Sequence, residues 1–129
     1  MSRTTRLAAV IGTGAVLAVP TLVLASAPAS ADVERNGVCG GGSYEFTVDR
    51  EGRGFEVETS LDNVAPGSRW RVLMSHDGKR FANRVIRADY EGEIDLDRYR
   101  GNTAGADVFS FRAKRVGGTA TCSASIAVR

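Results

Sequence analysis

Hydrophobic and polar residues alternate along most of the chain after residue 42, and a period of two is typical of half-buried β-strands. The clearest example is the stretch 68–78, which contains the only tryptophan of the chain. There Trp70, Val72 and Met74 fall on one face of the expected strand. Because this apolar face must be covered, we expect a second sheet opposite it. The same pattern predicts seven strands, at residues 43–49, 55–61, 68–75, 80–88, 93–97, 109–114 and 119–128.

Turn residues separate these segments. The Asp77-Gly78 pair tolerates the positive φ values of a tight hairpin turn, and the glycines at 52, 54, 117 and 118 predict two further hairpins. Residues 32–42 are polar and end in three glycines, so they predict an irregular entry segment, and residues 98–107 predict a loop. The pattern as a whole predicts an all-β, antiparallel sandwich domain over residues 43–129.

One predicted strand is less regular than the others. Within residues 80–88, Phe81 and Val85 share one face, while Ile86 lies on the other. Such a break in the alternation predicts a bulge or a position at the edge of a sheet.

The first 31 residues have the pattern of a secretory leader. Arg3 and Arg6 precede an uncharged, mostly apolar run at residues 7–25, and the small residues at 29–31 are those that a signal peptidase accepts. We expect a signal peptide that is cleaved after Ala31, and a secreted, extracellular product without a transmembrane segment. An uncleaved anchor is the alternative, although glycines and a proline interrupt the apolar run.

Removal of the leader changes the charge balance. The full chain has 17 Lys and Arg against 15 Asp and Glu, and the leader holds two of the basic residues and none of the acidic ones. The mature part is therefore expected to be neutral overall. Net charge then gives no support to nucleic-acid or membrane binding, and we expect no nucleic-acid partner.

Cys39 and Cys122 are the only two cysteines, and they lie near opposite ends of the expected mature chain. In an oxidising compartment they predict a disulfide that closes a loop over most of the domain. On the chain-entropy account such a link is worth about 4 to 5 kcal/mol. Free or intermolecular thiols are the alternative.

Four strings, VAPGSRWRV at 64–72, HDG at 76–78, GADVFSFRA at 105–113 and GTATC at 118–122, resemble small secreted proteins that are widespread in actinobacteria. These motifs consist mainly of turn and core residues, so the resemblance implies no catalytic residue. The chain also resembles immunoglobulin-like domains in the position of its tryptophan, because Trp70 lies on the third predicted strand and near one end of the predicted disulfide. The predicted bridge differs, because the immunoglobulin bridge joins the second and sixth strands.

A second resemblance is to the secreted seven-stranded proteins that carry enediyne chromophores. It rests on chain length, leader and sandwich architecture, and it implies a small-molecule carrier. Those carriers have two short-range disulfides, whereas this chain predicts one long-range link.

The single histidine, His76, is followed by Asp77 and raises the possibility of a Ser-His-Asp arrangement with a distant serine. The pair falls in a predicted hairpin tip, which we expect to be exposed. Turn formation explains the aspartate better than orientation of an imidazole. No nucleophile-elbow or metalloprotease motif is present in the sequence.

Acidic residues gather between residues 93 and 107. Oxygen ligands for Ca²⁺ could converge from one predicted strand and the loop after it, but the spacing lacks the ligand loop of an EF-hand. We favour a solvated strand face and expect no metal and no cofactor. The side chains concerned are Glu93, Asp95, Asp97, Asn102 and Asp107.

Charges of opposite sign segregate by strand. The outward positions of the first, second and fifth predicted strands, and the residues next to them, are acidic: Glu45, Asp49, Glu56, Glu58, Asp62, Glu93, Asp95 and Asp97. Those of the third and sixth strands are basic: Arg69, Arg71, Arg112 and Lys114. If the acidic strands share a sheet, the neutral domain has one acidic and one basic face.

We therefore expect a non-enzymatic binding module whose four basic residues form the interaction face. The expected partner is an anionic cell-envelope polymer or another protein. A surface that only confers solubility is the simpler alternative.

Overall fold

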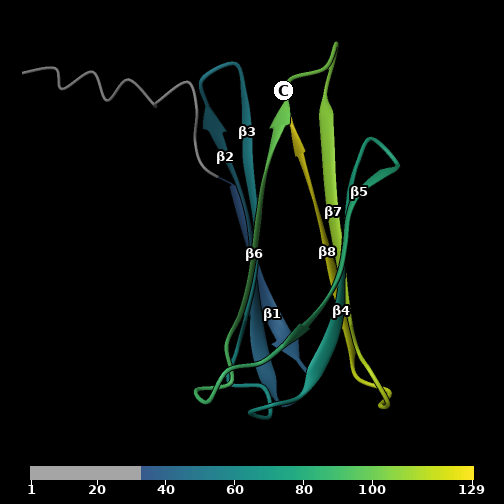
Figure 1. The fold of residues 1–129 in the computed structure, drawn as a ribbon. Helices are drawn as coiled ribbons and strands as arrows, with labels where there is room; N and C mark the ends of the chain where they lie inside the picture. Colours follow the sequence, from purple (N-terminus) through teal and green to yellow (C-terminus); the bar gives the residue numbers. More distant parts are fainter. Residues whose placement is uncertain (1–32) are drawn as a thin grey trace, which may run out of the picture.

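The computed structural model describes residues 33–129, which form two four-stranded antiparallel sheets that face each other (Figure 1). One sheet, sheet A, has the strand order β1-β2-β3-β6, and the other, sheet B, has the order β5-β4-β7-β8. The predicted signal peptide at residues 1–31 lies outside the described residues. The strands are β1 (Val33–Cys39), β2 (Gly42–Glu51), β3 (Gly54–Asp62), β4 (Arg69–His76), β5 (Lys79–Arg87), β6 (Ile94–Gly101), β7 (Asp107–Arg115) and β8 (Thr121–Val128).

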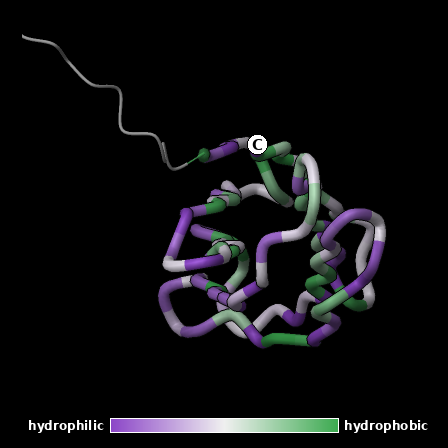
Figure 2. Tube along the Cα trace, turned by 90° about the horizontal axis from the view of Figure 1, so that it is seen from above, coloured by the Kyte–Doolittle hydropathy of each residue, from purple (hydrophilic) through white to green (hydrophobic). Residues whose placement is uncertain are grey.

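The predicted alternation places the core between the two sheets. In the view from above, hydrophobic and hydrophilic residues are intermixed in both sheets (Figure 2). Rings from the two sheets meet in this layer: the ring centroids of Phe46 and Phe111 are 5.0 Å apart, and those of Phe55 and Phe109 are 5.2 Å apart. Trp70 is 1% exposed, as its alternating strand predicted. Aromatic side chains thus fill the space between the sheets.

Residues 33–129 form eight strands, so the prediction of seven was wrong by one. Residues 32–42 were expected to be irregular, but β1 pairs with β2 along its whole length. The inward positions of β1 include Arg35 and Gly37, so they lack the hydrophobic alternation that identifies a strand. Gly37 is needed because the ring of Tyr44 lies over it, where a Cβ atom would be 2.4 Å from the ring.

The predicted loop at 98–107 was also too long, because β6 continues to Gly101. Arg98 and Arg100 occupy inward positions on this edge strand and hide the alternation. Arg100 places its guanidinium 4.8 Å from the centre of the Phe81 ring. A cation over an aromatic face is a stable arrangement for an arginine at the rim of a core.

The irregular strand at 80–88 is an edge strand, β5, and its pairing with β4 shifts register between Met74 and Ser75. Both features that the broken alternation predicted are thus confirmed. The predicted tight turn before β5 is present as well, with φ of 50° at Asp77 and 81° at Gly78.

The predicted disulfide is present. Cys39 at the end of β1 and Cys122 near the start of β8 are bonded, with 5.3 Å between their Cα atoms. The bond links an edge strand of sheet A to an edge strand of sheet B, which lie beside each other. Within residues 33–129 there is no helix that could cross a membrane.

Candidate functional site

The four predicted interaction residues lie together on the outward face of sheet B. Arg69 and Arg71 come from β4, and Arg112 and Lys114 come from the neighbouring strand β7. Arg71 is directly opposite Lys114 in the register, and all four side chains are exposed. The sequence therefore predicted a contiguous group.

The structure adds two arginines from β5 to this surface. Arg87 is opposite Arg69, and Arg80 is opposite Ser75. Sequence analysis missed them because β5 has a bulge and an irregular pattern. We call the six outward cations the basic face: Arg69, Arg71, Arg80, Arg87, Arg112 and Lys114.

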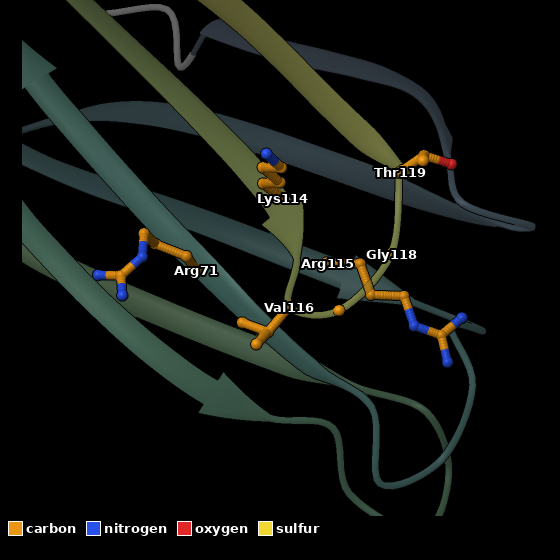
Figure 3. Close-up of a pocket in the computed structure, with 7 residues that line it drawn as sticks. Arg71, Lys114, Arg115, Val116, Gly118 and Thr119 are labelled. Atoms are coloured by element: carbon orange, nitrogen blue, oxygen red, sulfur yellow. The ribbon is translucent and has the colours of Figure 1, made fainter.

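A hollow of about 480 Å³ opens at one end of the basic face. Arg71, Lys114 and Arg115 line it, together with the turn at 116–119 between β7 and β8. In Figure 3 the guanidinium groups of Arg71 and Arg115 extend away from each other on opposite sides of this turn. Arg71 also donates a hydrogen bond of 2.8 Å to the side-chain oxygen of Asn83.

A second hollow, of about 210 Å³, lies further along the same face. Arg80 and Arg112 line it together with Leu73, Ser75 and Ser110. Guanidinium groups present forked donors that match carboxylate and phosphate oxygens. The two hollows therefore place anion-binding side chains beside concave surface.

The outward face of sheet A has the opposite sign. The strands predicted to be acidic, now β2, β3 and β6, are neighbours in one sheet, as the segregation of charge required. Glu34 from β1 and Glu51 from β2 extend the group. We call the nine outward carboxylates the acidic face: Glu34, Glu45, Asp49, Glu51, Glu56, Glu58, Asp62, Asp95 and Asp97.

Like charges on the acidic face disturb one another. A side-chain hydrogen bond with Glu51, and the charge of that residue, raise the pKa of Glu56. Burial raises the pKa of Glu45, and the charges of Glu34 and Glu58 raise it further. These carboxylates lose a proton less readily because burial and negative neighbours both disfavour the charged form.

His76 does not lie in an exposed tip, so that expectation was wrong. It is the last residue of β4, on the core face, and is 4% exposed. Its Nε2 atom is 2.7 Å from Oδ1 of Asp107 and 3.6 Å from Oδ2 of Asp77. Its ring stacks on Phe109, with 4.3 Å between the centroids.

Thr103 ties both aspartates of this cluster to the loop between β6 and β7. Its hydroxyl lies 2.6 Å from Oδ1 of Asp107 and 2.9 Å from Oδ2 of Asp77. Burial tends to raise the pKa of Asp107, but hydrogen bonds from Thr103 and His76 outweigh it and hold the pKa below the usual value. The backbone amide of Val108 is the main cause of the lowered pKa of Asp77.

Among the described residues, His76, Asp77 and Asp107 form a group of potential metal ligands whose atoms lie within 4.8 Å of one another. Hydrogen bonds between residues of this cluster account for its geometry. Asp107 is 1% exposed in this cluster, so it does not join Asp95 and Asp97 on the acidic face. The arrangement fastens the β4–β5 turn to the β6–β7 loop.

Comparison of the chain with protein-family models, with curated proteins and with solved structures finds no match. The two charged faces and the hollows beside them are therefore the features of the molecule that bear on its function.

Proposed function

We propose that the protein is a secreted, non-enzymatic binding module, and that its basic face binds an anionic polymer of the cell envelope. The observation that supports this most directly is the composition of that face. Six cations occupy outward positions of β4, β5 and β7, and none of the outward positions of these strands is acidic. Such a surface creates a positive potential on a domain that has no net charge of its own.

A repeating anionic polymer suits this surface better than a single small anion. An exposed ion pair is worth only about 0.2–1 kcal/mol, so one contact holds very little. Several contacts along one polymer act together, because after the first contact the others become intramolecular. The two hollows on the same face allow a chain to follow the surface.

The proposal includes an immunoglobulin-like architecture and export. The strand orders β2-β3-β6 and β5-β4-β7-β8 are compatible with the A-B-E and C′-C-F-G orders of such domains, with β1 as an added edge strand. Export is supported by the leader pattern at residues 1–31 and by the disulfide, which is typical of oxidising compartments.

The test measures retention of the purified extracellular product on cell-wall material as salt is raised. Replacement of Arg69, Arg71 and Arg112 by serine should abolish the salt-sensitive part of the retention. The matched control replaces three exposed arginines outside the basic face, Arg35, Arg53 and Arg84, because it changes the net charge equally. Equal retention of the two variants would contradict the proposal and favour a surface that only confers solubility.

The alternative, a small-molecule carrier, has less support. A carrier needs space between its sheets or loops. Here Tyr44 and Phe46 of sheet A both contact the ring of Phe111 of sheet B, with centroids 5.1 and 5.0 Å apart. A change in Trp70 fluorescence upon addition of a metabolite would favour the carrier, since Trp70 lies in this layer.

A further inference from the structure

The acidic face and the basic face are opposite in sign, and both belong to the same molecule. The acidic face lies on the outer surface of sheet A and takes residues from all four of its strands, and the basic face lies on the outer surface of sheet B and takes residues from β4, β5 and β7. The outward positions of β1, β2, β3 and β6 include no Lys or Arg, and those of β5, β4, β7 and β8 include no Asp or Glu. An acidic surface and a basic surface of this kind are complementary in charge.

The protein does not neutralise these charges internally. Apart from Asp49, which this statement leaves out, the side chains of the acidic face and of the basic face form no ion pair with another residue in the range 33–129. Within the acidic face, Glu58 lies directly opposite Asp97. Like charges opposite each other destabilise a sheet, so a positive surface placed over them would relieve the repulsion.

The open edges of the sandwich are poorly suited to pairing with another copy. Arg84 occupies an inward position on edge strand β5, and Arg98 and Arg100 do so on edge strand β6. Charged residues that point inward on an edge strand prevent another strand from adding to the sheet. On the other side, the disulfide clasps β1 to β8. A second copy is therefore directed to the faces.

We propose that the acidic face of one copy binds the basic face of a second copy. This inference rests on the proposed function, because it names an anionic partner for the same basic face. The contact joins different surfaces of the two copies, so each complex leaves one acidic and one basic face free. Repetition of such a contact builds open stacks rather than a closed dimer.

The size of the faces sets the strength of the contact. Four strands about 4.8 Å apart and eight residues at about 3.3 Å each give a face of about 500 Å². A stable complex buries about 800 Å² on each partner, so the stacks should be weak. Electrostatic attraction reaches about 30 Å at 0.01 M salt but only about 3 Å at 1 M, so salt should dissociate them.

The experiment uses two charge-reversal variants of the purified extracellular product. The first replaces Arg69, Arg71, Arg112 and Lys114 by glutamate, which leaves two cations against four carboxylates on that face and makes both faces acidic. The second replaces Glu45, Glu51, Glu56, Glu58, Asp95 and Asp97 by lysine, which leaves three carboxylates against six lysines on that face and makes both faces basic. Circular dichroism and Trp70 fluorescence confirm that each variant is folded. If a reversal unfolds the protein, the same positions are replaced by serine and only the loss of association is measured.

Sedimentation velocity gives the mass of each sample at low and high salt. The unmodified protein should show a mass that rises with concentration at about 0.01 M salt and falls to the monomer at about 1 M. Each variant alone should stay monomeric, and an equimolar mixture of the two should associate again. An unmodified protein that stays monomeric at low salt, or a mixture that does not associate, overturns the inference.

Retention on cell-wall material distinguishes this inference from the proposed function. The variant with two basic faces cannot stack, but it keeps the basic face and should still be retained. Retention without association therefore refutes stacking alone. Association without retention keeps the stacking and refutes the polymer as a partner.

Discussion

Removal of the disulfide between Cys39 and Cys122 should lower the free energy of unfolding more than any of the other changes considered below. The bond joins residues 83 positions apart and therefore restricts most of the unfolded chain. On the chain-entropy relation, a loop of this size corresponds to about 4.5 kcal/mol at 25 °C. A domain of this size has a free energy of unfolding of about 5–15 kcal/mol, so the link supplies a large part of it.

Urea unfolding followed by Trp70 fluorescence measures this loss. With a denaturant slope of about 1–2 kcal/mol/M, the midpoint should fall by about 2.3–4.5 M in the Cys39→Ala/Cys122→Ala variant. Both sulfurs are buried, so the alanines also leave a small cavity. The thiol-reduced unmodified protein is the control, because it loses the link but keeps both sulfur atoms.

The two samples together test the physical reason for the loss. If the link acts on the unfolded chain, both samples should lose similar stability, and both should show a steeper denaturant slope because the freed chain expands. A loss below about 1 kcal/mol in the reduced protein would refute the chain-entropy account. It would also show that the packing between the sheets is sufficient to hold the domain together.

Three further predictions concern single positions. The lowered pKa of Asp107 stabilises the fold at pH values above the usual aspartate pKa of about 3.9, and this stability should be lost as the pH falls through the lower folded pKa. The urea midpoint, measured from pH 7 downward, should therefore fall less steeply with pH in the Asp107→Asn variant than in the unmodified protein. Thr103→Val removes the hydroxyl hydrogen bond to Asp107 and should cost about 1–3 kcal/mol in thermal unfolding. Gly42→Ala should lower the free energy of unfolding in urea by about 1–3 kcal/mol, because the new Cβ would lie 2.1 Å from the backbone oxygen of Asp62. Gly101→Ala is the control: its Cβ would meet nothing within 4 Å, so the free energy of unfolding should hardly change.

The fold was predictable where inward positions are hydrophobic without interruption. Between the strand ends, the inward residues of β4 and β7 are all apolar, and both strands were found within two residues of their bounds. β1 was missed because an arginine and a glycine occupy its inward positions. Edge strands tolerate such residues, because one side of the strand faces solvent. Sequence periodicity therefore finds central strands more readily than edge strands.

The surroundings of His76 could be predicted only in part. The alternation that places Trp70, Val72 and Met74 in the core continues to position 76, so it favoured a buried histidine. Its place next to the Asp77-Gly78 turn suggests exposure, but the alternation of the strand decides the outcome, and His76 is buried. Asp107, its main partner, is 31 residues away, and periodicity within one strand cannot show which distant loop packs against it.

The sign of the charge on each face follows the path of the chain between the sheets. The chain crosses from sheet A to sheet B after β3, returns for β6 and crosses again before β7, and the outward charges change sign at each crossing. Alternating signs within one sheet would have stabilised it, because opposite charges across strands contribute about 0.2–1 kcal/mol per pair. Neither sheet has such stabilising pairs on its outward face, so the stability of the fold does not explain the arrangement. A contact with something of opposite charge outside the molecule does explain it, and this is why binding is the stronger proposal.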